Sequence, residues 1–570
     1  MSDLLNQASL VMVPSGYKED TVYSVVPSDG SGDLSFTRAS NGTRVNSAGL
    51  VEVCPWNLAE QSNAFNTSPW SIGSVAGTNP IITANYGIAP DGTLTAQRIQ
   101  LARTNTTTSY SQIYQYPIAV VIGQTYTWSV WLKSLSGTPT ISIIGDFGRP
   151  PVTLTSEWVR YTGTGTASSG LTQLEIAILG SNYATGNSLS ADFLAYGYQI
   201  NIGSTAKPYF PTTDRLNVPR LTYQNGGGGC PSLLLEKQST NVILYSEQFD
   251  DASWTKNVSV TANAIISPDG TQNADKILES ASNVQQWAYQ SPSMTGAQTA
   301  TIYAKKGERN YIAMATAGLD PSYFNLDTGV VVSTASGATA SITSVGNGWY
   351  RCSVSSASIV GGTFYIVWIS YDGVNRSYAG DTSKGIYVWG AQNEASSYPT
   401  SYIPTTSSSA TRVADACFKN GITSLIGQSE GTLFAEFIFN SATFPTMVMF
   451  LTTNSSFANA VYIQTFSSDG LSFQVWSGVV NQVSINTTGL TNGQKVKVAV
   501  GYKANDFVIY INGVQKGTDT SGSLPASLNN LEIGTYLEGG SPYTYAQSIN
   551  QAAVFKTRLT NAELASLTTI

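Results

Sequence analysis

The chain carries the same series of landmarks twice. The stretch KPYFPTTD at residues 207–214 has a near copy, TSYIPTTS, at residues 400–407, and each follows a similar glycine-containing run. Four further landmarks precede each copy in the same order. The matched residues are Phe65 and Phe249, Trp70 and Trp254, Asp91 and Asp269, Ile99 and Ile277, Trp158 and Trp349, Gly197 and Gly390, and Tyr209 and Tyr402. Their preserved order, with small changes in spacing, indicates a tandem duplication.

Both copies have the pattern of antiparallel β-structure. Short alternating runs such as TYTWSVWLKS and GTFYIVWISYD are separated by turn signals such as Pro-Asp-Gly and Gly-Asn-Gly. No amphipathic helical stretch of useful length interrupts them. We therefore predict an all-β chain of tandem β-sandwiches in which residues 55–213 (module 1) and residues 241–412 (module 2) are each a two-sheet jelly roll.

Composition limits the classes of protein that fit this pattern. A chain of 570 residues is too long for one hydrophobic core, and charged residues make up 11% of it, against roughly 25% in an average soluble domain. The net charge of −7 and the pI near 4.9 give no basic surface for nucleic acid. A run of about 18 apolar residues, which a membrane helix needs, does not occur. The N-terminus lacks a secretory signal pattern, so we expect synthesis in a cytoplasm and no membrane insertion.

Cysteine and histidine usage exclude several chemistries. The four cysteines are too sparse for a disulfide scaffold, and we expect them to be buried free thiols. Histidine is absent, which removes Ser-His-Asp catalysis, Cys-His catalysis and histidine-based zinc sites. A glycosidase needs two carboxylates placed across the scissile bond, and no spacing singles out a pair among Glu52, Glu157, Glu175, Glu436 and Glu532. We therefore expect no enzyme activity, while a polysaccharide-degrading enzyme stays open as an alternative.

The last part of the chain has a different character. Residues 498–515, VAVGYKANDFVIYINGVQ, and residues 552–564, AAVFKTRLTNAEL, resemble the laminin-G or concanavalin A-like lectin fold. The pair Asn512-Gly513 is a hairpin signal, and Thr560 with Glu563 forms the pattern of a helix capping box. The resemblance implies a lectin-like sandwich over residues 413–570.

The N-terminal segment carries the most specific resemblance. Residues 34–58, LSFTRASNGTRVNSAGLVEVCPWNL, together with residues 217–249, NVPRLTYQNGGGGCPSLLLEKQSTNVILYSEQF, resemble structural proteins of tailed phages and prophages of gut bacteria. Modules 1 and 2 are similar to the carbohydrate-binding-module-like sandwiches of phage fibre proteins. The resemblance implies that residues 1–54 are an attachment segment and that residues 214–240 are a linker that pairs with it in one small sheet.

Candidate sugar-binding residues come from the aromatic side chains. A sugar site needs an aromatic face for the pyranose ring and polar groups for its hydroxyls. The tryptophans at matched positions in the two copies are expected in the cores. Trp128 and Trp131 are three apart on one expected strand, so one of them should point outward. Trp287 and Trp476 lie near expected loops and complete the candidate set.

Calcium is the metal most often associated with both sandwich types. Asp91, Asp192, Asp269 and Asp381 are loop or strand-end carboxylates that could supply oxygen ligands. The competing interpretation is local, because Asp91 and Asp269 sit in Pro-Asp-Gly sequences where aspartate favours the turn itself.

These observations predict a phage virion structural protein, a head- or tail-fibre component whose domains adhere to bacterial surface polysaccharide. Its partners would be other virion proteins, held through the N-terminal segment, and copies of itself, with a homotrimer expected although no heptad pattern supports that number. The alternative is a decoration protein that binds no glycan. The sequence leaves open the glycan, the place in the virion and the neighbouring subunit.

Overall fold

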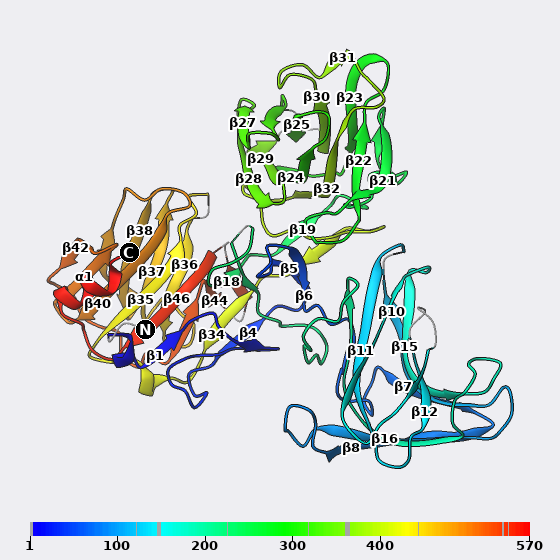
Figure 1. Ribbon diagram of the computed structural model, residues 1–570. Helices are drawn as coiled ribbons and strands as arrows, with labels where there is room; N and C mark the ends of the chain where they lie inside the picture. Colours follow the sequence, from blue (N-terminus) through cyan, green and yellow to red (C-terminus); the bar gives the residue numbers. More distant parts are fainter. Residues whose placement is uncertain are drawn as a thin grey trace. The chain divides into compact units, whose positions relative to one another are not determined.

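The computed structural model describes residues 4–120, 122–144, 150–224, 226–316, 319–359, 365–442, 444–538, 541–544 and 547–570 (Figure 1). The predicted all-β class is confirmed: within those ranges the regular structure is antiparallel strands, two short 3-10 turns, η1 (Leu5–Gln7) and η2 (Thr423–Leu425), and the helix α1 (Asn561–Thr568). No helix in the described part of the chain is long and apolar enough to cross a membrane. The chain divides into two units, Cys54–Leu216, and Met1–Val53 together with Asn217–Ile570.

The unit Cys54–Leu216 contains module 1 and consists of two five-stranded sheets. The first sheet has the order β13 (Pro151–Thr153), β12 (Thr140–Ile144), β15 (Leu171–Leu179), β10 (Tyr110–Ala119), β7 (Trp70–Val75). The second has the order β14 (Val159–Thr166), β11 (Thr125–Ser134), β16 (Ser190–Ile202), β9 (Ala96–Arg103), β8 (Gly77–Gly87). Alternate residues of both sheets, among them Ile113, Trp128 and Ile176, form a buried core.

Module 2 lies in the other unit and repeats this arrangement. One sheet has the order β20 (Thr255–Lys256), β23 (Asn283–Gln290), β30 (Tyr365–Ser370), β25 (Tyr311–Thr316), β26 (Ser322–Asn325), β27 (Val330–Ser333), with β31 (Ser377–Ala379) beside β23. The other has the order β21 (Ser259–Ile265), β22 (Ala274–Leu278), β32 (Gly385–Glu394), β24 (Gly296–Lys306), β29 (Trp349–Ile359), β28 (Ala338–Gly346). The strands of module 1 each have a counterpart in module 2, and β27, β28 and β31 are additions in module 2.

The matched residues of the duplication have the same structural roles. The indole nitrogens of Trp70 and Trp254 each donate to a backbone carbonyl nine residues earlier, at 3.0 and 3.2 Å. The hydroxyls of Tyr209 and Tyr402 each hydrogen bond a serine at the start of their own module, at 2.8 and 2.6 Å. Because these contacts close each sandwich in the same way, the matched positions serve the fold.

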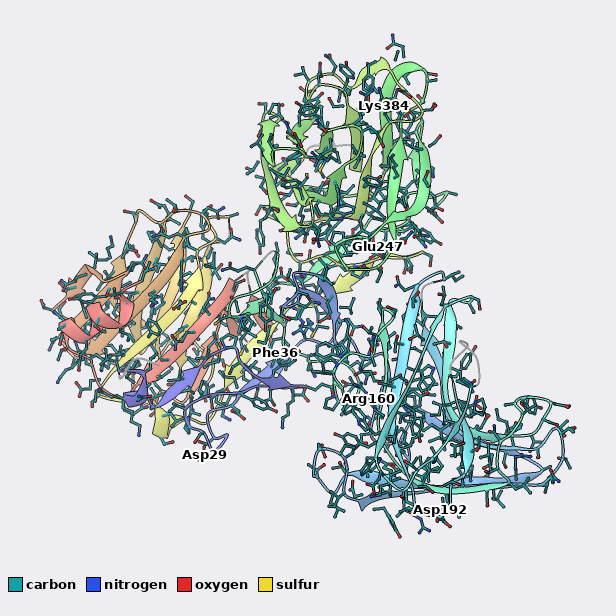
Figure 2. All side chains as sticks on the ribbon, viewed as in Figure 1. Asp29, Phe36, Arg160, Asp192, Glu247 and Lys384 are labelled. Carbon is teal, nitrogen blue, oxygen red and sulfur yellow. The ribbon has the colours of Figure 1, made fainter. Side chains whose placement is uncertain are left out.

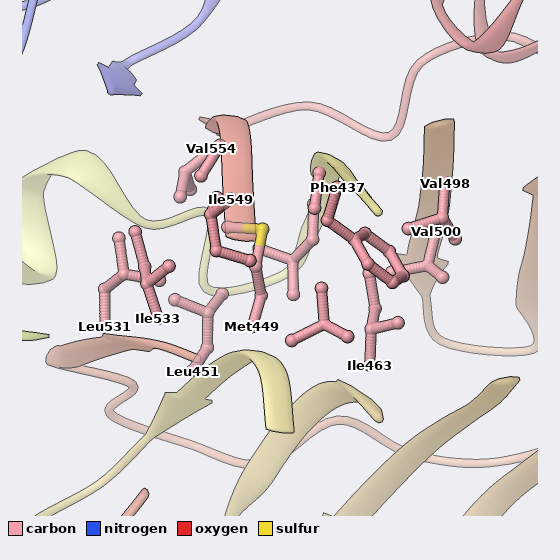
Figure 3. Packing of buried hydrophobic residues seen from close by; sticks show 14 of the residues in the cluster. Phe437, Met449, Leu451, Ile463, Val498, Val500, Leu531, Ile533, Ile549 and Val554 are labelled. Atoms are coloured by element: carbon pink, nitrogen blue, oxygen red, sulfur yellow. The ribbon is translucent and has the colours of Figure 1, made fainter. Parts of the chain in front are cut away.

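The C-terminal sandwich has two large sheets. One has the order β17 (Leu221–Thr222), β18 (Ser232–Leu235), β46 (Gln547–Phe555), β35 (Glu430–Ile438), β40 (Lys495–Lys503), β41 (Asp506–Ile511), β42 (Val514–Asp519), and β1 (Leu10–Met12) also pairs with β46. The other has the order β2 (Tyr17–Lys18), β3 (Thr21–Val22), β4 (Leu34–Thr37), β34 (Ala416–Lys419), β43 (Asn530–Ile533), β36 (Thr446–Thr452), β37 (Ala460–Ser467), β38 (Gly470–Ser477), β39 (Val480–Asn486). Figure 3 shows part of the apolar core between them, to which Phe437, Met449 and Ile549 belong. Short pairs complete the strands: β5 (Gly42–Val45) with β6 (Val51–Cys54), β19 (Ser239–Asn241) with β33 (Ala410–Arg412), and β44 (Thr535–Glu538) with β45 (Ser541–Thr544).

The structure corrects the prediction for the N-terminal segment. Residues 1–54 and 214–240 were expected to pair in one small sheet. They do meet, since the amide of Tyr223 donates to the carbonyl of Val45 at 2.9 Å, but β1, β4, β17 and β18 belong to the two sheets of the C-terminal sandwich. Phe36 and Leu233 are fully buried in its core (Phe36 is labelled in Figure 2). Burial of these apolar side chains explains why the segments join the sandwich. The prediction for the cysteines also needs a correction, because Cys230 is exposed while the other three thiols are buried.

A buried group of charges holds these segments together. Asp415 accepts from Arg38 at 2.9 Å and also from Arg220, and Arg220 donates to Glu236 at 2.8 Å. Arg412 forms a further ion pair with Glu236 at 3.3 Å. All five side chains are at most 4% exposed. The N-terminal segment, the residues before module 2 and the first strands of the C-terminal sandwich therefore meet at one ionic junction.

Candidate functional site

Aromatic side chains form a row across the outer face of one sheet of module 2. Trp287 on β23 pairs directly with Trp368 on β30, and Trp368 pairs with Ala313 on β25. Ala313 pairs in turn with Tyr323 on β26. Directly opposed residues of antiparallel strands share a face, so these four side chains lie side by side and opposite the core. The small Ala313 lies between Trp368 and Tyr323.

Polar groups are placed along the same row. The indole nitrogen of Trp368 donates to Gln285 at 3.2 Å, and the guanidinium of Arg376 lies 4.8 Å from a ring centroid of Trp368. The ring of Tyr289 lies 4.9 Å from that of Trp287. Trp368 is almost fully buried, whereas Trp287 and Tyr289 are half-buried. The arrangement offers aromatic surface next to hydrogen-bond donors and acceptors, which is the chemistry that a sugar ring requires.

The backbone at this row is held firmly. The side-chain oxygen of Asn257 accepts a hydrogen bond from the backbone amide of Trp287 at 2.8 Å. The backbone amide of Asn257 donates to the carbonyl of Trp287 at 3.1 Å. Its side-chain amide also donates to the carbonyl of Gln285 at 2.5 Å. The row is therefore positioned before any ligand arrives, which lowers the ordering cost of binding.

Module 1 differs from module 2 at these positions. Gln115 and Gln290 mark equivalent places, because each side chain bonds both the amide and the carbonyl of one residue near the start of its module. Three residues before each marker stand Gln112 and Trp287. Their cross-strand partners are Ala177 in module 1 and Trp368 in module 2. The duplicated sandwiches thus agree at fold-forming positions and differ on this outer face.

The outer face of module 1 carries a carboxylate instead. Glu175 pairs with Tyr114 across the strands, is fully buried, and accepts from the side chain of Gln173 at 2.8 Å. This face carries Gln112, Gln173 and Glu175 beside Tyr114, so it does not offer a ligand the same contacts as the face of module 2.

The C-terminal sandwich has a third outer face. Glu532, Phe450, Tyr462 and Gln474 form its transverse row. Glu532 accepts from Ser455 at 2.6 Å and from the amide of Leu537 at 2.7 Å, and burial raises the pKa of its carboxyl to about 7. Phe450 and Tyr462 are buried in an apolar cluster, and the half-buried Phe457, Trp476 and Tyr536 pack against it.

The four tryptophan candidates have different environments. Trp128 lies in the core of module 1 at 2% exposure, against Gly163, so the structure removes it from the candidates. Trp131 does point out of that core, but Arg160 stacks over it at 4.3 Å. Trp476 is half-buried beside the apolar cluster of the C-terminal sandwich. Trp287 is the candidate that stands in a row of aromatic side chains.

All four calcium candidates have local partners, and Asp269 accepts from the side chain of Ser267 and from Thr271 within its own turn. Asp91 accepts from Thr93 and from the hydroxyl of Tyr196 at 2.7 Å. Asp192, labelled in Figure 2, forms a two-point ion pair with Arg98 at 2.9 and 2.6 Å. Asp381 accepts from Ser383 and pairs with Lys384 at 3.2 Å. These contacts fit the local interpretation and leave their oxygens poorly placed for a cation.

Asp269 lies near a second carboxylate. The side-chain amide of Asn273 donates to Asp269 at 3.1 Å and to Glu247 at 3.2 Å. Burial, and then the negative charge of Asp269, raise the pKa of Glu247 to about 8. Among the described residues no group of three or more Asp, Glu, Cys or His side chains is arranged to hold a metal ion.

Comparison with known proteins identifies one part of the chain. Residues 423–565 match the family model of the concanavalin A-like lectin/glucanases superfamily. The C-terminal sandwich is a concanavalin A-like domain. That prediction is confirmed, and the helix α1 at its end begins with the expected capping box of Thr560 and Glu563. No curated protein matches the chain.

Solved structures show only distant similarity. The sialidase carbohydrate-binding module CBM40 of Ruminococcus gnavus, bound to α2,3-sialyllactose, is 15% identical, with 25% of this chain and 84% of that chain covered and a TM-score of 0.23. The tandem CBM22 domains of Paenibacillus barcinonensis Xyn10C are 14% identical over 60% of this chain and 98% of theirs, with a TM-score of 0.21. Domains LG4-5 of the mouse laminin α1 chain are 8% identical over 54% and 92%, with a TM-score of 0.19. Scores this low say nothing about the ligand of this chain.

Two residues of the aromatic row, and Tyr289 beside it, were not among the candidates from the sequence. Tyr289, Trp368 and Tyr323 were not candidates, because strand pairing between distant segments is invisible in a single alternating run. A signal was nevertheless present, since the aligned copies differ at Gln112 and Trp287 while their core tryptophans agree. At the matched positions that the structure describes, module 1 has Gln112 and Ala177 in place of Trp287 and Trp368.

Proposed function

We propose that the chain binds glycan through the outer face of module 2 that carries Trp287. The observation that carries this proposal is the row of Trp287, Trp368 and Tyr323, which strand register places on one face beside Gln285 and Arg376. Trp287 and Tyr289 offer ring surface for a pyranose, and the amide and guanidinium groups offer hydrogen bonds to hydroxyls. The face arose where the duplicated modules differ, which is expected if it serves a ligand.

The wider role that we propose is that of a phage virion structural protein, a head- or tail-fibre component that adheres to bacterial surface polysaccharide. A single shallow site binds sugar weakly, and several copies on one particle would raise the avidity without new contacts. We expect a homotrimer. Support for the virion role comes from the resemblance of residues 34–58 and 217–249 to phage structural proteins.

The virion role is tested by gold-labelled antibody to this chain on intact particles, viewed by electron microscopy. Label on fibres at the capsid or tail is the expected result. Protein that stays free in the lysate, with no labelled particle, would refute the fibre role. Light scattering of the pure chain tests the trimer, and a mass near 60 kDa would contradict it.

Replacing Trp287 by alanine is expected to weaken glycan binding about tenfold. The change removes the exposed ring of the row, and a lost ring contact costs about 1–2 kcal/mol. The measurement is a titration of host surface polysaccharide against intrinsic tryptophan fluorescence. Tyr183→Ala is a matched control, because Tyr183 is an exposed aromatic residue of module 1.

The outcomes of this titration separate the alternatives. Equal affinities of Trp287→Ala and the unchanged chain would show that sugar binds elsewhere, and Trp476→Ala would then test the concanavalin A-like domain. A flat titration with every host polysaccharide would favour the decoration protein that binds no glycan.

A further inference from the structure

A β-hairpin covers an aromatic surface at one end of module 2. The surface comprises Tyr303, Trp349, Trp389 and Tyr402, which are at most 4% exposed, and Val51 of the hairpin β5–β6 packs in their cluster. The amide of Val51 donates to the carbonyl of Pro268 at 2.9 Å. Thr43, on the other strand of the hairpin, donates to the carbonyl of Tyr402. We call these four aromatic residues the covered end surface.

Leu50, the residue before Val51, packs against Gly270 of module 2. A Cβ added to Gly270 would lie 2.8 Å from Cδ1 of Leu50, so Leu50 packs directly against the backbone there. The hairpin thus binds through two consecutive aliphatic side chains, Leu50 and Val51, through the amide of Val51 and through the hydroxyl of Thr43. Pro268 and Gly270 belong to the Pro-Asp-Gly turn of module 2.

Module 1 has the same surface. Trp131, Trp158, Tyr196 and Tyr209 occupy the equivalent positions, and we call them the open end surface. The indole nitrogen of Trp158 donates to the carbonyl of Ile88 at 3.2 Å, as that of Trp349 donates to Ile266 at 3.1 Å.

Two arginines also have equivalent contacts in the two end surfaces. Arg160, labelled in Figure 2, stacks on Trp131, and Arg351 stacks on Tyr303 in the same way. Arg160 donates to the carbonyl of Lys207 and Arg351 to that of Thr400, each at 2.7 Å. The two end surfaces therefore share the contacts of their tryptophans and arginines, while Tyr196 also donates to Asp91 and Tyr402 also donates to Glu247.

Within the unit Cys54–Leu216, the described residues place no hairpin on the end surface of module 1. Gly92 corresponds to Gly270, and in the part of the chain that the structure describes nothing lies within 4 Å of a Cβ added to Gly92. Trp131, Trp158 and Tyr209 remain half-buried, whereas their counterparts in module 2 are buried. Among the described residues no backbone amide donates to the carbonyl of Pro90, the counterpart of Pro268.

We propose that the open end surface of module 1 is a docking site for a β-hairpin of a partner protein that presents a Leu-Val pair as Leu50 and Val51 do. Module 2 shows which occupant fits: aliphatic side chains on the aromatic residues and the glycine, and one amide on the proline carbonyl. The partner is a separate protein, because the chain's own hairpin is held on module 2 by its bonds to Pro268 and Tyr402.

The proposal is tested with a synthetic peptide of residues 42–53, closed by a disulfide between added terminal cysteines and labelled with fluorescein. Fluorescence anisotropy with the intact chain is expected to show saturable binding. The hairpin on module 2 is tethered, so its effective concentration excludes the free peptide there and leaves module 1 as the acceptor. A peptide with Leu50 and Val51 both changed to aspartate should bind at least tenfold more weakly.

Variants of module 1 show whether the peptide binds at the open end surface. Trp131→Leu should lower the affinity for the peptide at least fivefold. Thr93→Arg places a bulky side chain at an exposed position beside Gly92, and it should lower the affinity to the same extent if Trp131→Leu fails to fold. Ile88→Ser is the matched control, because Ile88 is 57% exposed and its counterpart Ile266 stays 61% exposed beside the docked hairpin.

Three results would overturn the proposal. In the first, the unchanged peptide does not bind at millimolar concentration. In the second, it binds, but neither Trp131→Leu nor Thr93→Arg weakens the binding. In the third, the peptide does not bind, and polysaccharide gives a tryptophan fluorescence response that is lost in Trp131→Leu. The last result would make the open end surface a sugar site. None of these results bears on the aromatic row of module 2, which Trp287→Ala tests separately.

Discussion

Replacing Asp415 by asparagine is expected to lower the free energy of unfolding of its unit by about 3–5 kcal/mol. Asp415 is fully buried and accepts hydrogen bonds from Arg38, from Arg220 and from the amide of Glu236. The change removes the negative charge and leaves two buried guanidinium groups facing a neutral side chain. Chemical denaturation followed by tryptophan fluorescence measures the loss.

A surface pair provides the control for this change. Asp327 pairs with Lys306, and both side chains are about half exposed, so Asp327→Asn should cost less than about 1 kcal/mol. If Asp415→Asn costs no more than this control, the buried junction does not hold the segments together.

Acid should weaken the same junction. Burial alone would raise the pKa of Glu236, but Arg412 and then Arg220 outweigh it and hold the pKa at about 2. A lowered pKa in the folded state means that the stabilisation is present above the ordinary value of 4.5 and is lost as the pH falls toward 2. Stability of the unit should therefore fall steadily below about pH 4.5.

Replacing Glu247 by glutamine is expected to stabilise module 2 at alkaline pH. The pKa of Glu247 is raised to about 8, so the folded state holds a proton that the unfolded state has already released above 4.5. Stability of the unchanged chain therefore falls as the pH rises from 4.5 to 8, and glutamine removes this loss. The full shift corresponds to about 5 kcal/mol, and partial exposure of Glu247 reduces the expected gain to about 3 kcal/mol.

The measurement is the difference in unfolding free energy between Glu247→Gln and the unchanged chain at pH 5 and at pH 9. We expect a small difference at pH 5 and a gain of about 3 kcal/mol at pH 9. Glu308→Gln is a suitable control, because hydrogen bonding to Lys276 lowers the pKa of Glu308 and that variant should gain nothing at pH 9. A difference that does not change with pH would show that Glu247 ionises normally in the folded chain.

The distribution of contacts explains why some sequence predictions failed. Trp128 and Trp131 share β11, and alternation correctly separates their faces, but which face is the core depends on the sheet that packs against β11. The strands β4 and β18 look like parts of a separate segment because their partners β34 and β46 lie far along the chain. Asp192 looked like a metal ligand because its partner Arg98 lies on the distant strand β9.

Local patterns in the sequence alone determined the all-β class, the duplication and the concanavalin A-like domain. Alternation with a period of two, turn residues and the capping box are encoded within a few neighbouring residues, so they can be read without a structure. Tertiary structure alone decided the row of Trp287, Trp368 and Tyr323, the ionic junction around Asp415 and the two end surfaces. These depend on the register between distant strands, and a slip of one residue would turn every side chain to the opposite face.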